Sequence, residues 1–195
     1  FEDVKEIINN LADPSYYWIS DQGKKSCPKN YIDLKMELTK VDTTNPNTTS
    51  QIKASQVYAN VFTSGTTGLP KASRQTNRKW MATYYWFGKV NMNLNTDDVM
   101  YVPLPFYHTN SIIVGWPTAL AASCTMVMRR KFSVTHFWED VAKYNVSAFI
   151  YIGELCRYLL NAPPSDLEKK HRITKIMGNG LRPDIWHQFK ERFQI

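Results

Sequence analysis

Short apolar runs alternate with amphipathic segments through most of this chain, and this alternation constrains the fold more than any other feature. The apolar runs predict strands at residues 99–102, 125–128, 148–152 and 173–177. The intervening and final segments predict helices at about 109–122, 134–144, 154–161 and 183–193. Strands that alternate with short helices indicate βαβ units, so we expect an α/β fold with a mostly parallel sheet flanked by helices.

The stretch from residue 99 to residue 128 contains no Asp, Glu, Lys or Arg, which raises the question of a membrane span. Pro103, Pro105 and Pro117 interrupt this stretch. A buried helix between two buried strands therefore explains its composition better than a spanning helix does. The composition of the whole chain, 43% hydrophobic and 21% charged, is ordinary for a soluble globular protein.

The basic residues are dispersed, although the net charge is +7 at pH 7. The two basic runs, 129–131 and 169–172, are interpreted as solvated faces in preference to nucleic-acid or lipid patches, and we expect no nucleic-acid partner. Cys27, Cys124 and Cys156 are odd in number and lack metal-ligand spacing. This favours reduced thiols in a cytosol-facing compartment, with no metal site on these residues.

A loop rich in glycine and hydroxyl side chains follows a β-branched and aromatic run at 56–62. Its residues are Thr63, Ser64, Gly65, Thr66, Thr67, Gly68, Leu69, Pro70 and Lys71. The glycines let backbone N–H groups approach anionic oxygens, the hydroxyls add donors, and Lys71 adds a positive charge. With an amphipathic helix predicted from about residue 76, we expect a strand–loop–helix unit that binds a polyphosphate. The alternative is a plain Ser/Thr/Gly linker, and the glycine spacing differs from that of the common phosphate loop.

Two further segments come at the ends of predicted strands. Tyr107 and His108 follow the strand at 99–102, and Gly178, Asn179 and Gly180 follow the strand at 173–177. A single histidine is equally consistent with a structural role, and Gly-Asn-Gly by itself can be a turn. Because the carboxyl ends of parallel strands share one edge, we expect both segments to lie beside the glycine-rich loop.

Several other polar residues are expected to be structural or exposed. Ser133 is a predicted N-cap, and Glu154 and Arg157 are a predicted (i, i+3) pair. The remaining histidines are expected at the surface: His136, His171 and His187.

The residues 64–71 resemble the signature loop of the adenylate-forming superfamily. Other segments resemble the fatty acid transport protein family, the very long-chain branch of the acyl-CoA synthetases: 104–108, 131–133, 137–140, 143–145, 151–159 and 178–181. This resemblance runs from about residue 57 to residue 195.

We therefore divide the chain into residues 1–55, an N-terminal segment and polar linker, and residues 56–195, part of an AMP-binding domain. Residues 1–11 predict a helix and 16–19 a short strand, and the whole is interpreted as an internal fragment of the N-terminal domain of an adenylate-forming enzyme.

The resemblance implies ATP-dependent activation of a long- or very long-chain fatty acid to acyl-CoA through an acyl-adenylate. It implies that residues 63–68 and Lys71 hold the terminal phosphates of ATP, and that residues 178–180 lie against adenine. Tyr107 and His108 would border the acyl channel, with Lys71 and His108 as the catalytic residues. Coenzyme A is the implied co-substrate. The implied Mg²⁺ ligand and a further lysine would lie outside the chain, so we expect no activity from these residues alone.

A second hypothesis is a membrane-associated fatty acid transport protein in which ligation is secondary. The two overlap, because trapping an acid as its CoA thioester itself drives uptake. The loop with Lys71 favours ligation, since it has little purpose without ATP. Both readings imply an intracellular membrane location (endoplasmic reticulum, peroxisome or plasma membrane) with the catalytic domain facing the cytosol. The sequence departs from the family at Thr109 and Asn110, where a Ser-Ala pair is common, and also at Asn60 and Ser73.

Overall fold

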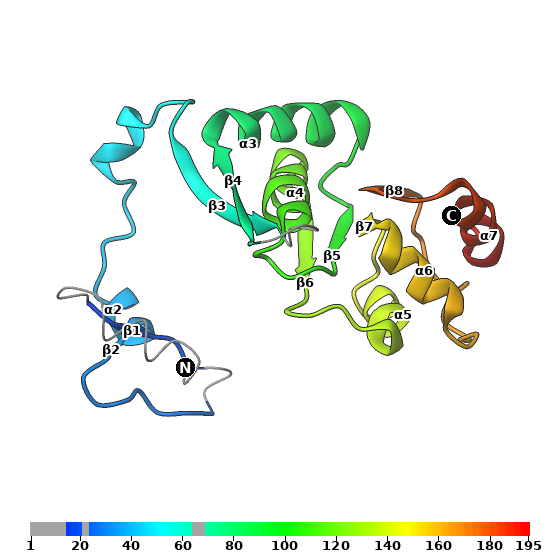
Figure 1. Cartoon of the computed structure of the whole chain (residues 1–195), viewed down its shortest axis with the longest axis horizontal. Coiled ribbons are helices and arrows are strands. Elements are labelled where there is room, and N and C mark those ends of the chain that lie inside the picture. The colour runs from blue at the N-terminus through cyan, green and yellow to red at the C-terminus, as the bar shows by residue number, and fades with distance from the viewer. Residues whose placement is uncertain (1–14, 21–23, 64–68) are drawn as a thin grey trace. The chain divides into compact units, whose positions relative to one another are not determined.

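Residues 15–20, 24–63 and 69–195 are described by the computed structural model in Figure 1. The chain divides into two units, residues 1–51 and 52–195. In the first unit, β1 (Tyr17–Trp18) pairs in parallel with β2 (Ile32–Asp33). The helices α2 (Leu34–Leu38) and η3 (Asn47–Gln51), the latter of 3-10 type, follow them. The predicted helix at 1–11 lies outside the described residues.

The larger unit contains a parallel sheet of four strands in the order β6-β5-β7-β8. These strands are β5 (Val99–Val102), β6 (Thr125–Met128), β7 (Ala148–Ile152) and β8 (Lys175–Asn179). The first three have the predicted bounds, which confirms the α/β fold with a parallel sheet. The bounds predicted for the fourth were wrong by two residues. Ile173 is buried, but its N–H donates to His171 Nδ1 and not to a neighbouring strand.

Helices follow the strands as predicted, with bounds that agree to within one residue. A π-helix, η5 (Asn110–Gly115), runs directly into α4 (Trp116–Ala122) between β5 and β6. The others are α5 (Val134–Lys143), α6 (Gly153–Asn161) and α7 (Pro183–Phe193). Ser133 caps α5, since its Oγ accepts the N–H of His136 at 3.4 Å, and Glu154 pairs with Arg157 on α6. Both predictions are confirmed.

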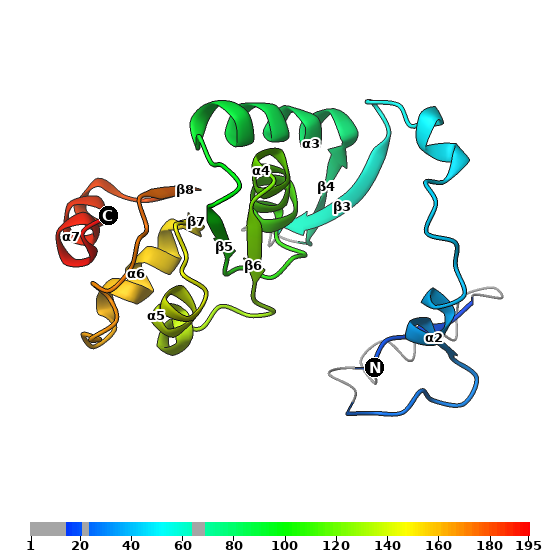
Figure 2. The same cartoon turned by 180° about the vertical axis from the view of Figure 1, so that it is seen from behind.

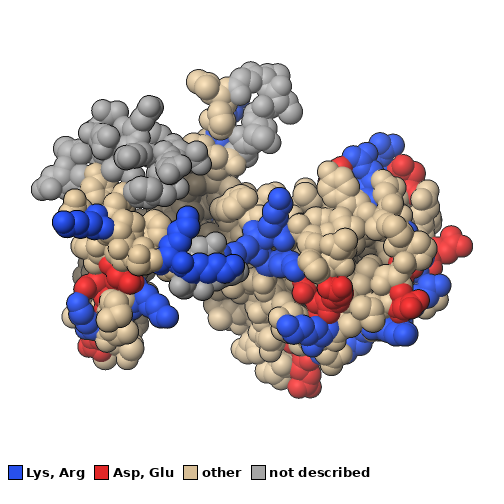
Figure 3. All heavy atoms as spheres, turned by 90° about the horizontal axis from the view of Figure 1, so that it is seen from below, with Lys and Arg blue, Asp and Glu red and all other residues tan. Residues whose placement is uncertain are grey.

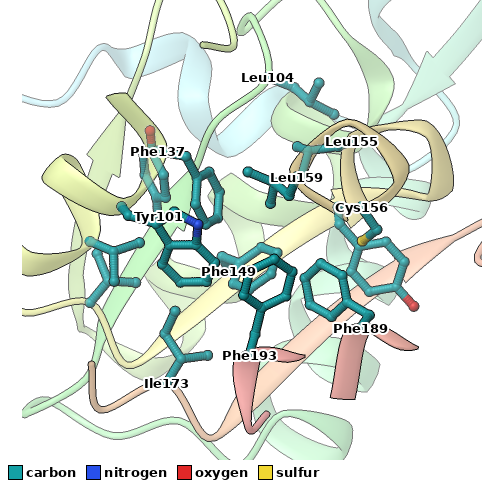
Figure 4. Close-up of a cluster of buried hydrophobic side chains, with 14 residues drawn as sticks. Tyr101, Leu104, Phe137, Phe149, Leu155, Cys156, Leu159, Ile173, Phe189 and Phe193 are labelled. Atoms are coloured by element: carbon teal, nitrogen blue, oxygen red, sulfur yellow. The ribbon is translucent and has the colours of Figure 1, made fainter. Parts of the chain in front are cut away.

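The two faces of the sheet pack against different helices because side chains alternate along each strand. Tyr101 and Phe149 point toward α5, α6 and α7, where they meet Phe137, Leu155 and Phe193 in a cluster shown in Figure 4. Met100 and Ile150 occupy the opposite face, in a second cluster with residues such as Ala119 of α4. Both faces are thus covered, as parallel sheets require. No helix among the described residues is long and apolar enough to cross a membrane.

An antiparallel hairpin precedes the parallel sheet. Its strands, β3 (Val57–Thr63) and β4 (Lys71–Thr76), pair with Thr63 opposite Lys71. The strand–loop–helix prediction is therefore wrong, because the loop joins two strands and α3 (Asn77–Thr83) begins only after β4. The sequence of β4 is polar, and Gln75 is its only buried residue, so the strand carries no apolar run that would reveal it.

The helix α3 continues without a break into a π-helix, η4 (Tyr84–Asn91), and packs against α4 (Figures 1 and 2). Close packing here depends on Gly88. A Cβ at that position would overlap Ala121 of α4. The hairpin is thus linked to the sheet by a helical segment that packs against α4, while η5 and α4 contact the strands.

A buried carboxylate joins the amino ends of three strands. Asp98, just before β5, accepts hydrogen bonds from Ser147 Oγ at 2.6 Å, from the Asn95 N–H at 2.9 Å and from Lys175 Nζ at 3.3 Å. Ser147 precedes β7 and Lys175 begins β8. Burial raises the pKa of Asp98, but these hydrogen bonds outweigh burial and hold the pKa below its ordinary value.

Asp98→Asn should lower the free energy of unfolding by about 1.5–3 kcal/mol at neutral pH, the typical contribution of hydrogen bonds to a charged group. A carboxyl group whose pKa is lower in the folded state than in the unfolded state stabilises the folded protein. This stabilisation is complete above the unfolded-state pKa of about 3.9 and is lost as the pH falls through the folded-state pKa. The difference in free energy of unfolding between wild type and variant should therefore be smaller at about pH 3 than at neutral pH. Urea unfolding at both pH values checks this, with Asp97→Asn at the exposed neighbour as the control. A difference that does not change with pH would contradict the expected role.

Candidate functional site

The carboxyl edge of the parallel sheet carries five of the residues that the sequence singled out. Tyr107 and His108 follow β5, and Gly178, Asn179 and Gly180 lie at the end of β8. The prediction that all three of the latter form a loop was wrong. Gly178 and Asn179 are the last residues of β8, paired with Tyr151 and Ile152 of β7, and only Gly180 lies beyond the strand.

Glycines bring the backbone close together at this edge. A Cβ on Gly153, the first residue of α6, would overlap the carbonyl of Gly180 and lie 2.9 Å from the Leu181 nitrogen. A Cβ on Gly178 would overlap the Tyr151 carbonyl. Gly180 has a φ of +73°, in the left-handed region that favours glycine. Because residues 178–180 are exposed, this edge presents bare backbone against which a planar ring can lie.

His108 is half-buried and held by the backbone on both sides. The backbone N–H of His108 donates to the Pro105 carbonyl at 2.9 Å, and the ring Nδ1 accepts the backbone N–H of Asn110 at 3.1 Å. Burial lowers the pKa of the imidazole, so the neutral form is favoured at neutral pH. Tyr107, in contrast, is 80% exposed at the surface of the same loop.

A hollow of about 460 Å³ adjoins this loop, between the carboxyl ends of β5 and β6. It is lined by Pro105, Phe106, Tyr107, Met128, Arg129 and Arg130. The guanidinium of Arg129 is fixed by Asp140, whose Oδ2 lies 2.8 Å from the Arg129 Nε and 2.7 Å from the Tyr101 hydroxyl. Residues 129–131 were interpreted as a solvated face; Arg130 and Lys131 are exposed, whereas Arg129 is partly buried in this ion pair. The sequence carried no sign of this, because Asp140 and Tyr101 are distant along the chain.

The second basic run also includes structural residues. His171 was expected at the surface, but its ring stacks on Trp138 with centroids 5.5 Å apart, and its Nε2 lies 2.9 Å from the Phe193 carbonyl. Arg172 donates to the carbonyls of Asn145 and Asp97. In Figure 3, basic and acidic side chains are interspersed over the right-hand part of the larger unit.

The glycine-rich loop is described only at its two ends. Residues 64–68, and with them Ser64, Gly65, Thr66, Thr67 and Gly68, lie outside the described residues. Thr63 ends β3 and Lys71 begins β4, so the two flank the base of the loop as a cross-strand pair. Lys71 is exposed. The expected edge shared by all three loops is not formed by one sheet, because β3 and β4 make a sheet of their own.

Asn110 is a residue of this region to which the sequence analysis gave no role. Its side chain is buried, and Nδ2 donates to the Tyr151 carbonyl at 3.2 Å. Its Oδ1 is buried without a hydrogen-bond partner in the part of the chain that is described. The only signal in the sequence was that Asn110 departs from the family pattern after His108.

Comparison with known proteins identifies the family. The model of the AMP-binding enzyme family matches residues 3–195. The chain belongs to the AMP-binding enzyme family. This match includes most of residues 1–55, where the resemblance had not been seen.

This AMP-binding chain is 39% identical over 163 residues to the medium/long-chain-fatty-acid–CoA ligase FadD6 of Mycobacterium tuberculosis, covering 84% of the chain and 27% of that protein. It is 37% identical over 198 residues to the long-chain fatty acid transport protein 6 of Mus musculus, covering 97% of the chain and 30% of that protein. The chain thus spans less than a third of the length of these relatives.

The fold of this AMP-binding chain also occurs in solved structures. The crystal structure of the anthranilate CoA ligase AuaEII in complex with anthranoyl-AMP matches 98% of the chain and 37% of that protein, with a TM-score of 0.83 and 14% identity. This similarity shows that the chain has the fold of the corresponding part of that ligase. Among the described residues, no group of three or more His, Cys, Asp and Glu side chains is arranged to hold a metal ion.

Proposed function

We propose that the protein containing this chain activates long- or very long-chain fatty acids with ATP, forming acyl-CoA through an acyl-adenylate. The observation that carries this proposal is the 37–39% identity, over most of the chain, to a fatty-acid–CoA ligase and to a fatty acid transport protein. Because the chain spans only part of these relatives, the activity is proposed for the longer protein.

In this proposal the fatty carboxylate attacks the α-phosphorus of ATP, and pyrophosphate leaves. Residues 63–68 and Lys71 hold the terminal phosphates, and the charge of Lys71 stabilises the negative charge that grows on the leaving group. Residues 178–180 lie against adenine, which their exposed backbone suits. The thiol of coenzyme A then attacks the acyl carbonyl and displaces AMP. Mg²⁺ would be held by residues outside the chain and would supply charge neutralisation at the phosphates.

The acid would bind at the loop after β5. Tyr107 and His108 lie at the same sheet edge as the proposed adenine site, so an acid held there could reach a nucleotide. The neutral imidazole of His108 suits a hydrogen bond to a carboxylate oxygen. The hollow beside Tyr107 would be the entrance for the apolar chain, since Pro105, Phe106 and Met128 line it together with two arginines.

A transport role is the second candidate function, and the name of the mouse relative favours it. We propose that the longer protein is associated with an intracellular membrane (endoplasmic reticulum, peroxisome or plasma membrane), with this domain facing the cytosol. Ligation and transport separate in one measurement. Uptake of fatty acid that persists when adenylation is abolished would favour transport as the primary role.

An ATP–pyrophosphate exchange assay on the longer protein tests the proposed function. Exchange should depend on a long-chain fatty acid, and its absence would contradict the proposal.

His108→Ala should lower the fatty-acid-dependent rate by about 10- to 100-fold, the effect of losing one hydrogen bond to a charged group. The affinity for ATP should change little, because the imidazole contacts the acid and not the purine. His136→Ala, at an exposed histidine of α5, is the control. Loss of ATP affinity as large as the loss of rate would contradict a contact of His108 with the acid alone.

A further inference from the structure

His108 acts as the N-cap of the helical segment that leads into η5. Its carbonyl accepts the N–H groups of Ser111 and Ile112 at 2.9 and 3.1 Å, as the carbonyl of an N-cap residue does. Its Nδ1 accepts the N–H of Asn110 at 3.1 Å, which satisfies one of the helix N–H groups that have no partner within the helix. The imidazole thus replaces the Ser, Asn or Asp oxygen usual at this position.

This cap determines where the imidazole proton lies. A neutral histidine has one ring nitrogen that donates and one that accepts. Since Nδ1 accepts from Asn110, the proton must be on Nε2. Protonation would remove the acceptor and place a positive charge at the start of a helix, where the helix dipole disfavours it.

Asn110 fixes the geometry of this cap. Its side-chain Nδ2 donates to the Tyr151 carbonyl at 3.2 Å, and Tyr151 lies in β7, opposite Gly178 of β8. Asn110 is 6% exposed, so the contact is shielded from water. The N–H that contacts His108 is therefore tied to the same sheet edge that carries residues 178–180.

We propose that His108 is held as its Nε2–H tautomer, with Asn110 as the positioning residue, and that it serves the site only as a hydrogen-bond donor. The ligand group it would meet is an acid or acyl oxygen, and this identification rests on the proposed function. In this arrangement His108 does not accept the thiol proton of coenzyme A, because Nδ1 is engaged by the cap and Nε2 already carries a proton.

The tautomer can be measured without any activity. In the 195-residue chain with ¹⁵N-labelled histidine, two-bond proton–nitrogen spectra distinguish a protonated from an unprotonated ring nitrogen. With only four histidines, the signal of His108 is identified by its absence in His108→Asn. We expect an unprotonated Nδ1 and a protonated Nε2 at neutral pH. A proton on Nδ1, or an equal mixture of tautomers, would overturn the proposal.

Asn110→Ala should populate both tautomers of His108, and unchanged signals would show that Asn110 does not position His108.

Two substitutions distinguish the role of His108 as a helix cap from its role as a hydrogen-bond donor to the ligand. His108→Asn keeps an acceptor for the Asn110 N–H but has no donor at the Nε2 position. His108→Gln places an amide donor near Nε2 but loses the cap. In the longer protein, we expect His108→Asn to keep the wild-type melting temperature and to lose fatty-acid-dependent exchange by about 10- to 100-fold. His108→Gln should melt earlier but retain more of the exchange.

Failure of this inference is distinguishable from failure of the proposed function. If stability and exchange fall in parallel in both variants, His108 is a structural cap and the donor role is wrong. If the wild-type protein shows no exchange at all, the proposed function fails, but the spectra and the order of melting temperatures still decide the tautomer.

Discussion

Gly153→Ala is expected to destabilise the larger unit by more than about 3 kcal/mol, beyond the usual cost of overpacking a core. The added Cβ would overlap the Gly180 carbonyl, which is backbone and cannot rotate away as a flexible side chain does. To relieve this overlap, α6 must move away from the end of β8. Such a movement disturbs packing, because both elements contribute to the core cluster in Figure 4. Urea unfolding followed by far-UV circular dichroism measures the change.

The matched control is Gly180→Ala on the other side of the same contact. Its nearest neighbour would be the Gly153 nitrogen at 3.8 Å, so space is available, but the φ of +73° strains an alanine by about 1–2 kcal/mol. The control should therefore be destabilised less than Gly153→Ala. Equal effects of the two substitutions would show that backbone strain and not the close approach limits this edge.

Lys71→Ala is expected to slow fatty-acid-dependent ATP–pyrophosphate exchange by about 10²- to 10³-fold, the effect of removing one contact to charge that develops in a transition state. The fatty acid affinity should change little, because Lys71 acts on the phosphates in the proposed mechanism. The charge is an exposed one at the first residue of β4, so its removal should leave the fold intact.

Arg74→Ala in the same strand is the control for Lys71. Arg74 is also exposed and basic, but it lies three residues further along β4 and therefore on the opposite face of the hairpin. Exchange should be close to wild type in the control. If Lys71→Ala kept more than half the wild-type rate at saturating ATP, or if both variants lost activity equally, the loop would have no specific phosphate role.

Patterns of burial that repeat along one element were enough to predict most of the parallel sheet. The strands at 99–102, 125–128 and 148–152 have apolar sequences because each is covered on at least one face by helices. The amphipathic segments at 134–143 and 183–193 place their apolar stripes on one face of the sheet. These features depend on neighbours within a few residues, so the sequence contains them directly.

The composition of the glycine-rich loop was enough to identify it, but it did not show that the loop joins two antiparallel strands. Its partner strand β4 is stabilised by backbone hydrogen bonds to β3, and these leave no trace in a polar, exposed sequence. The hairpin is defined by the pairing of the two strands, which only the tertiary structure shows.

The sequence by itself determined the α/β class, the order of the elements, and the residue types that make nucleotide and acid chemistry plausible. Only the tertiary structure decided how single polar side chains are used. Asp140 fixes Arg129, the stacking of Trp138 holds His171, and Asn110 ties His108 to β7. The physical reason is that local periodicity records burial, whereas a hydrogen bond between residues distant in the chain depends on where the folded backbone brings them together.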